Sequence, residues 1–367
     1  MKLSFVSHAG AVAYNSIYTE SNLIKEKLSE LIPSEVVDFL SQHVDIESKS
    51  TKILETSSRF NILNIEDDLL TNIVDIKKIN DIRYLNKFFQ AVNQKLPFEG
   101  IFIGNVETID ERRKRILGNR PNLFGQIYYG LDFLVKRVFP KTKLTRKLYF
   151  IITRGENRSI SLPETLGRLV SCGFQIVTYS EINNRVYFVA RKIHLPELND
   201  SPSYGPFFNM RRVGQNGKII HVYKLRTMHP FSEYLQQYIY DKNALDSGGK
   251  FKDDFRITSW GKVFRKLWID ELPMIINVFK GDLKIVGVRP LSRQYLDLYT
   301  EELKDRRLKF KPGLVPPYYA DMPKTIDEIM ASEERYLDAY ERSPFITDVR
   351  YFFKAFYNIL IKKARSK

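Results

Sequence analysis

The residues best suited to chemistry are two adjacent carboxylates, Asp270 and Glu271, in a mostly apolar stretch between residues 256 and 290. Arg265 lies shortly before the pair, and Arg289 follows at the end of the stretch. Two carboxylates among cations, close to a turn that carries an arginine, are suited to binding Mg²⁺ and a phosphate group. The alternative interpretation is that Asp270 only caps a helix, because aspartate is a favoured capping residue.

A short helix is predicted to hold the two carboxylates. Pro273 is tolerated only in the first turn of a helix, so the helix is expected to begin at about Asp270. Gly281 suits the position just after the helix end, where a left-handed backbone is needed. Helical spacing places four apolar residues on one face: Leu272, Ile275, Ile276 and Phe279. Both carboxylates would then lie at a helix N-terminus, where free N–H groups and the helix dipole favour anions.

This stretch resembles the catalytic core of the bacterial sugar transferases, also called monotopic phosphoglycosyl transferases. Their motif reads approximately R-x-x-x-L-D-E-L-P-Q-L-x-N-V-x-x-G-D-M-S-x-V-G-P-R-P. The matching residues follow in the same order and spacing: Arg265, Ile269-Asp270-Glu271-Leu272-Pro273, Asn277-Val278, Gly281-Asp282 and Val286-Gly287-Val288-Arg289-Pro290.

Two segments upstream extend the resemblance. Gly205 to Lys218 is similar to the family's G-P-V-F-F-x-Q-x-R-x-G-x-x-G-K, and Tyr223 to Met228 is similar to its Y-K-F-R-S-M. Gln215-Asn216-Gly217, between two alternating stretches, predicts a β-hairpin. The resemblance implies that Lys224 and Arg226 lie beside the acidic pair. The chain departs from the family at residues 315–318, and at 196–204, where a polar linker replaces the usual hydrophobic re-entrant helix.

The resemblance implies a reaction. A sugar 1-phosphate would pass from a UDP-sugar to polyprenyl (undecaprenyl) phosphate, which starts the assembly of exopolysaccharide, O-antigen or another glycan. Asp270 would attack the phosphorus and form an aspartyl phosphosugar, and Glu271 would hold Mg²⁺ as the cofactor. The remaining implied roles belong to basic residues and a proline: Lys224, Arg226 and Arg265 orient the substrate phosphates, and Arg289 and Pro290 bind the nucleotide.

The chain is long enough for two domains, and the sequence predicts an α/β fold with a boundary at a polar linker. Residues 1–195 are expected to form an N-terminal α/β domain of unknown role, 196–204 the linker, and 205–367 an α+β sugar transferase domain. The end of the first domain weakly resembles the C-terminal half of a class I methyltransferase sheet. No glycine-rich loop precedes that part, so a nucleoside cofactor is not expected there.

Charge and composition narrow the possible partners. The formal net charge of +15 suits nucleic acid, anionic lipid or phosphorylated substrates. The sequence contains no helix-turn-helix, RNP-like motif or zinc spacing, so nucleic acid is not expected as a partner. Cys172, the one cysteine, excludes an intrachain disulfide and fits a reducing cytosol.

Membrane contact is expected to be peripheral, on the inner face of the cell membrane. No stretch approaches the ~18 apolar residues of a membrane span. The stretch after Pro344 instead predicts a basic amphipathic helix, which either lies in the membrane interface or packs on its own domain. A catalytically inactive scaffold of a polysaccharide biosynthesis system is the alternative to an enzyme. The polar linker favours the scaffold, and the intact acidic pair opposes it.

Overall fold

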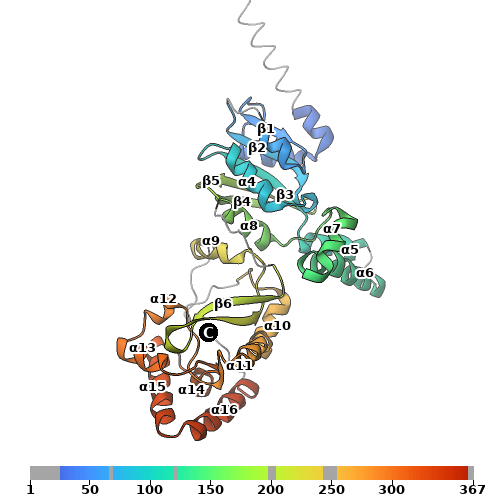
Figure 1. Ribbon diagram of the computed structural model, residues 1–367. Coiled ribbons are helices and arrows are strands. Elements are labelled where there is room, and N and C mark those ends of the chain that lie inside the picture. Colours follow the sequence, from blue (N-terminus) through green and yellow to red (C-terminus); the bar gives the residue numbers. More distant parts are fainter. Residues whose placement is uncertain (1–24, 66–68, 120–121, 197–203, 243–253, 363–367) are drawn as a thin grey trace, which may run out of the picture. The chain divides into compact units, whose positions relative to one another are not determined.

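The computed structural model describes residues 25–65, 69–119, 122–196, 204–242 and 254–362 (Figure 1). Their contacts divide the chain into two compact units. The first comprises residues 1–202 together with Pro230–Lys242, and the second comprises Ser203–His229 together with Asn243–Lys367. The segment Pro230–Lys242 thus packs with the first unit, although it lies far along the chain.

The first unit is built on a five-stranded sheet with the order β1-β2-β3-β5-β4. β1, β2 and β3 are parallel, and β5 runs antiparallel between β3 and β4. Asn183 and Asn184 have φ angles of 50° and 59°, as the tight turn of the β4–β5 hairpin requires. The strands span Thr51–Leu54 (β1), Asn72–Lys78 (β2), Ile101–Val106 (β3), Phe174–Ile182 (β4) and Arg185–Lys192 (β5).

Helices cover both faces of this sheet, because neighbouring strand residues point to opposite sides. Ile103 packs in a cluster with apolar side chains of α2, whereas the ring of Phe102 meets Phe89 of α4. The longer helices are α2 (Ser34–His43), α4 (Leu85–Lys95), α5 (Ile109–Asn119), α6 (Leu123–Phe133), α7 (Lys143–Thr153), α8 (Leu162–Ser171) and α9 (Gln236–Lys242). The shorter ones are α3 (Arg59–Leu63), η1 (Ile79–Asp81), η2 (Leu134–Val138), η3 (Phe139–Lys141) and η5 (Ser232–Leu235).

The late segment packs onto α8 of the first unit. A Cβ atom on Gly167 would lie only 2.1 Å from the carbonyl oxygen of Phe231, so this approach requires glycine. The guanidinium of Arg168 lies 4.3 Å from the centre of the Phe231 ring. These contacts fix η5 on the surface of α8.

The second unit contains a hairpin and a small parallel pair of strands. β6 (Phe207–Val213) and β7 (Ile219–Leu225) are antiparallel, and the turn η4 (Gln215–Gly217) confirms the predicted hairpin. β8 (Lys284–Val286) and β9 (Gly313–Val315) are parallel. The helices are α10 (Ser259–Leu267), η6 (Ile269–Met274), α11 (Ile275–Phe279), α12 (Arg293–Leu296), α13 (Glu301–Leu308), α14 (Pro317–Asp321), α15 (Ile326–Arg342) and α16 (Pro344–Leu360).

The last helix, α16, belongs to the core of the second unit. Ala355 and Ile359 are buried with Tyr319 of α14 and Leu337 of α15. The Asn358 amide also donates to the carbonyl oxygens of Tyr319 and Ala320. The other face of the helix, which includes Phe345 and Phe353, is exposed. Among the described residues, no helix combines the length and apolar character needed to cross a membrane.

Candidate active site

The acidic pair lies on a tight 3₁₀ turn, η6, that directly follows α10. Trp268 separates the two helices and has a left-handed backbone with a φ of 61°. This conformation costs a bulky residue of the order of 1–3 kcal/mol, so the surroundings must hold it. They do so through the indole: its Nε1 donates to the Tyr319 hydroxyl at 3.0 Å, and the two rings pack edge to face. The left-handed backbone of Trp268 therefore changes the direction of the chain just before Asp270.

Glu271 is buried and its two oxygens have separate partners. The Lys224 ammonium donates to Oε1 at 2.6 Å, and the Tyr319 hydroxyl donates to Oε2 at 3.1 Å. Burial alone would raise the pKa of Glu271, but the charges of Lys224 and Arg289 hold it below its ordinary value. Glu271 is therefore a fixed anion at neutral pH.

For Asp270, the neighbouring carboxylate, the effects that raise the pKa outweigh those that lower it. Asp270 is half-buried, and burial together with the charge of Glu271 raises its pKa. Lys224 and Arg265 oppose this rise because their positive charges favour the carboxylate form. Asp270 is thus a partly desolvated carboxylate beside a permanent anion, and its charge is sustained by two cations.

Lys224 reaches the pair because Asn277 joins its strand to the helix that follows the pair. Asn277 of α11 is fully buried, and its Oδ1 accepts from the Tyr223 N–H at 3.0 Å. Its Nδ2 donates to the His221 carbonyl at 2.8 Å. One amide therefore fixes β7, which carries Lys224, against α11.

The other two predicted phosphate ligands lie on neighbouring elements. Arg265, on α10, donates from Nε to the Thr227 hydroxyl at 2.9 Å, and its charge acts on Asp270. Arg226 donates from Nε to the Gly205 carbonyl at 3.0 Å, and its guanidinium lies over the Phe208 ring. The contacts described for Arg226 thus tie it to the start of the domain, whereas Lys224 contacts the acidic pair itself.

A cavity of about 450 Å³ opens beside Glu271. Its lining includes Glu271 and three other predicted site residues, namely Lys224, Arg289 and Pro290. Asp270, Arg226 and Arg265 are not among the described residues that line it. Apolar and aromatic side chains complete the wall, among them Met210, Val222, Met274, Leu291, Tyr295 and Tyr318.

The charged lining of the cavity favours an anion. Arg212 and Arg289 both line it, and burial together with the charge of Arg289 lowers the pKa of Arg212. Lys324 adds a further positive charge, while the two acidic lining residues, Glu271 and Glu333, are bound by Lys224 and Arg307. Two arginines that repel each other across a cavity would be stabilised by a phosphate group between them.

The acidic pair also fits the predicted Mg²⁺. In proteins this ion is commonly held by one or two carboxylates together with substrate phosphates. Glu271 uses one acceptor position on each oxygen and keeps further lone pairs. The repulsion that raises the pKa of Asp270 is the kind that a divalent cation relieves. No group of three or more His, Cys, Asp or Glu side chains in the described part of the chain could hold a metal alone.

The site residues that the sequence did not predict include Tyr319, Asn277 and Arg212. Asn277 stands in the motif of the acidic pair, so its position was a usable signal. Arg212 lies in the segment that resembles the family's first motif, but its neighbour Arg211 is equally basic and only the strand register separates them. Tyr319 directly follows residues 315–318, where the chain departs from the family motif, so no pattern pointed to it.

Comparison with known proteins finds similarity to sugar transferases. Residues 189–362 match the family model described as bacterial sugar transferase. The galactosyl transferase CpsE of Streptococcus agalactiae is 39% identical over 142 residues, which are 37% of this chain and 31% of the relative. The uncharacterized sugar transferase EpsL of Bacillus subtilis is 44% identical over 109 residues, or 29% of this chain and 47% of the relative.

A third relative is named for its lipid substrate. The undecaprenyl-phosphate galactose phosphotransferase of Salmonella typhimurium is 35% identical over 116 residues, which are 30% of this chain and 24% of the relative. The chain thus spans less than half the length of each of these three relatives. Residues 189–362 belong to the bacterial sugar transferase family, as the motifs predicted.

Proposed function

We propose that the chain is a phosphoglycosyl transferase that moves a sugar 1-phosphate from a UDP-sugar to polyprenyl phosphate. The observation that carries this proposal is the half-buried Asp270 beside Glu271, which is itself fixed by Lys224 and Tyr319 next to a cationic cavity. The Salmonella relative is named for transfer to undecaprenyl phosphate. A carboxylate without a role in chemistry would commonly lie on the surface in contact with water. Glu271 is instead buried and accepts hydrogen bonds from two side chains.

The cavity is assigned to the nucleotide sugar. Arg212 and Arg289 would bind the diphosphate, and Lys324 would add to their attraction for it. Pro290 and the aromatic residues Tyr295 and Tyr318 would contact the uracil or the sugar. Because Glu271 lines the cavity, binding there would hold the sugar-bearing phosphate close to the acidic pair.

The chemistry would take two displacements at phosphorus. A carboxylate oxygen of Asp270 attacks the sugar-bearing phosphorus, and the bond to the nucleoside phosphate breaks, which releases UMP. A phosphate oxygen of the polyprenyl acceptor then attacks the same phosphorus. The bond to Asp270 breaks and the carboxylate is regenerated. Arg265 and Lys224 would orient the phosphate oxygens in both steps, and Arg226 would support the strand that carries Lys224.

Glu271 would hold Mg²⁺ together with substrate phosphate oxygens. When bound, the ion would screen the diphosphate charge and stabilise the leaving phosphate. Tyr319 would keep Glu271 in position, because its hydroxyl binds the oxygen that Lys224 does not.

The enzyme would act at the inner face of the cell membrane, because polyprenyl phosphate does not leave the bilayer. Exposed apolar residues occur on three helical segments of the second unit. They are Trp260, Val263 and Leu267 of α10, then Leu272, Ile275, Ile276 and Phe279 of η6 and α11, and Phe345, Val349, Phe353, Phe356 and Leu360 of α16. Such faces would contact the headgroup region without spanning the bilayer.

For the first unit we propose a methyltransferase-like fold that has no nucleoside cofactor. The antiparallel β5, inserted between β3 and β4, supports the resemblance noted in the sequence.

The decisive experiment measures UMP release from a panel of UDP-sugars with polyprenyl phosphate and Mg²⁺. We expect release with one or a few UDP-sugars and a covalent sugar-phosphate adduct when the acceptor is omitted. A chain that releases no UMP and forms no adduct with any UDP-sugar would instead be a scaffold.

A further inference from the structure

The helices α6 and α7 of the first unit expose apolar faces that the sheet does not use. On α6 the exposed apolar side chains repeat at helical spacing: Leu123, Phe124, Ile127, Tyr128 and Leu131. On α7 the same spacing is followed by Leu144, Leu148, Ile151 and Ile152. Phe124 is 77% exposed and Leu144 is 91% exposed. Exposed apolar faces on two helices are unfavourable in water, and such patches commonly mark a site that binds a protein or a membrane.

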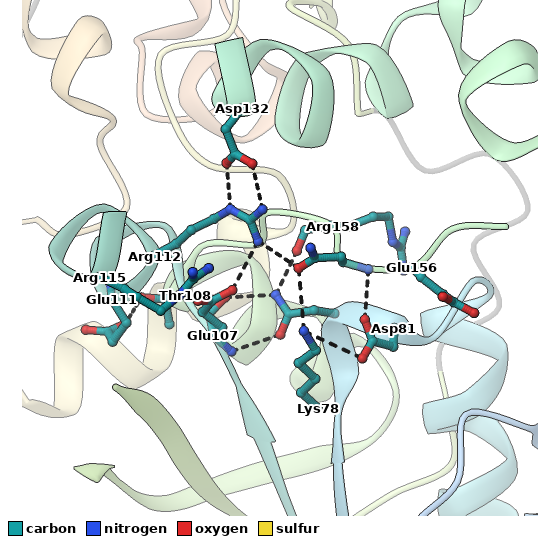
Figure 2. A network of polar contacts seen from close by, with 12 residues as sticks. Lys78, Asp81, Glu107, Thr108, Glu111, Arg112, Arg115, Asp132, Glu156 and Arg158 are labelled. Atoms are coloured by element: carbon teal, nitrogen blue, oxygen red, sulfur yellow. Dashed lines mark hydrogen bonds and ion pairs between the residues drawn. The ribbon is translucent and has the colours of Figure 1, made fainter. Parts of the chain in front are cut away.

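Figure 2 shows the buried ion pair between Asp132 and Arg112 that holds the end of α6 on the domain. Asp132 at the end of α6 accepts two bonds from Arg112, at 2.6 and 2.7 Å. Arg112 is almost fully buried and also binds Glu107 at 3.0 Å, so it joins α6 to the end of β3. In the segment between the helices, Arg137 pairs with the buried Glu164 of α8. The end of α6 and the segment that follows it are therefore tied to the domain, whereas the apolar side chains of α6 and α7 are exposed.

The charge of this region is strongly one-sided. Between residues 122 and 154 the sequence has a single acidic residue, Asp132, and Arg112 neutralises it. The same stretch carries seven basic residues: Lys136, Arg137, Lys141, Lys143, Arg146, Lys147 and Arg154. Arg137 and Lys141 are paired with the buried Glu164 of α8, so they do not add to the exposed positive charge. Arg146, Lys147 and Arg154 are exposed. Exposed aromatic and aliphatic side chains interspersed with lysine and arginine are the pattern of a helix that lies in an anionic membrane interface.

We propose that α6 and α7 insert their apolar faces into the headgroup region of an anionic bilayer, so that the first unit is itself a membrane anchor. The proposal deepens and rests on the proposed function, since a transferase that uses polyprenyl phosphate must work at a bilayer. Charge favours lipid over a second copy of the chain. In a two-fold dimer the same basic patch would face itself, whereas an anionic leaflet would neutralise it.

An added cysteine allows insertion to be read at single positions of the full chain. Cys172 is buried, and burial raises its pKa to about 11, so a thiol reagent at neutral pH will label an exposed cysteine selectively. The environment-sensitive dye NBD is attached to Leu148→Cys on α7 and to Ile127→Cys on α6. The matched control is Phe60→Cys, because Phe60 is an exposed apolar residue elsewhere in the same unit.

With vesicles of equal parts phosphatidylglycerol and phosphatidylcholine, we expect blue-shifted and brighter NBD emission at both positions, and no change at Phe60→Cys. Phosphatidylcholine alone should give a much weaker response. An unchanged spectrum at either helix overturns the proposal. A blue shift without vesicles that grows with protein concentration also overturns it, because it would show contact between copies.

Two charged variants complete the test: Leu148→Glu with Ile151→Glu on α7, and Phe124→Glu with Ile127→Glu on α6. Each should lower the vesicle partition coefficient by about tenfold or more, because two apolar side chains no longer insert. UMP release with a short, water-soluble polyprenyl phosphate should be unchanged. This second assay separates the two proposals: normal vesicle binding without UMP release refutes the enzyme, and UMP release without vesicle binding refutes the anchor.

Discussion

At the level of single residues, the site is defined by two adjacent carboxylates in different electrostatic environments. Lys224 and Arg289 lower the pKa of Glu271 against the effect of burial, whereas burial and Glu271 raise the pKa of Asp270. Environments that push the pKa values of neighbouring groups apart commonly separate their roles. Here Glu271 is a fixed anion that is suited to holding a metal ion, whereas Asp270 is a carboxylate with a raised pKa that is suited to attack.

The first prediction concerns the nucleophile. Asp270→Asn should lower UMP release by about 10⁴-fold or more and abolish the covalent adduct, because no carboxylate oxygen remains to attack. The melting temperature should stay the same or rise. A carboxyl with a raised pKa destabilises the folded state when it is charged at neutral pH, and asparagine removes that cost.

Asp297→Asn is the matched control, because Asp297 is exposed on another helix end of the same unit. It should leave both adduct and turnover unchanged. Near-normal turnover in Asp270→Asn would remove Asp270 from the mechanism, and a large fall in its melting temperature would make loss of activity uninformative.

The second prediction concerns pH. Asp270 must be ionised to attack, so activity is lost as the pH falls through its pKa in the folded enzyme. Arg265 lowers that pKa, and Arg265→Met should therefore move the acid limb of kcat/KM to higher pH. Lys262→Met, which removes an exposed cation from the same helix, should leave the limb in place. An acid limb that does not move in Arg265→Met would show that another group controls it.

At the level of elements, the sequence predicted the turns that depend on local residue types, and did not predict the turn that depends on tertiary contacts. The β6–β7 hairpin was predicted because Asn216 and Gly217 supply the positive φ angles of its turn. Gly281 likewise has a φ of 76° just after α11. The tight 3₁₀ turn before α11 was not predicted, since it depends on the left-handed Trp268, which is held by tertiary contacts, among them the one with Tyr319.

The apolar stripe of η6 and α11 shows what periodicity leaves open. Spacing correctly places Leu272, Ile275, Ile276 and Phe279 on a helical region, but all four are exposed. Periodicity identifies a face and does not say whether protein, membrane or water covers it. The packing of Pro230–Lys242 onto the first unit was missed for a similar reason, because the approach of Phe231 to Gly167 depends on contacts between distant parts of the chain.

The third prediction concerns the link between β7 and α11. Asn277→Leu keeps the approximate size but leaves the Tyr223 N–H and the His221 carbonyl without their buried partner. We expect a loss of about 2–4 kcal/mol in the free energy of unfolding, measured by urea denaturation. Turnover should also fall under conditions where the variant is folded, because Lys224 is no longer held against Glu271.

Asn209→Leu tests whether this effect is specific. Asn209 pairs with Tyr223 in the β-ladder, but its side chain is exposed. The substitution should change stability by no more than about 0.5 kcal/mol. Equal losses in the two variants would show that the destabilisation does not come from the buried hydrogen bonds of the Asn277 amide.

At the level of the whole molecule, one face of α16 packs in the core of the second unit, so the helix stabilises the fold whether or not it also contacts a membrane. The sequence left open whether this helix packs on its domain or lies in an interface, and the structure shows that one face packs. Asn358 holds the backbone of Tyr319, whose hydroxyl holds Glu271. Deleting the chain from Pro344 would therefore damage the site, and substitutions on the exposed face, such as Phe353→Glu, are the correct way to test membrane contact.

The last prediction is that binding to anionic vesicles has one component that salt removes and one that it does not. Residues 1–100 carry 11 basic and 14 acidic side chains, a net charge of −3, whereas residues 101–200 carry 17 and 9, or +8, and residues 201–367 carry 30 and 20, or +10. Each lysine or arginine near an anionic leaflet contributes about 1 kcal/mol, and salt screens this attraction beyond about 8 Å at physiological ionic strength. Apolar insertion is not screened, so high salt should release only part of the protein.

Co-sedimentation at low and high salt measures both components, and Phe353→Glu should reduce the salt-resistant part while Phe60→Glu does not. Complete release by salt would mean that the exposed apolar faces stay out of the bilayer and that charge alone attaches the protein.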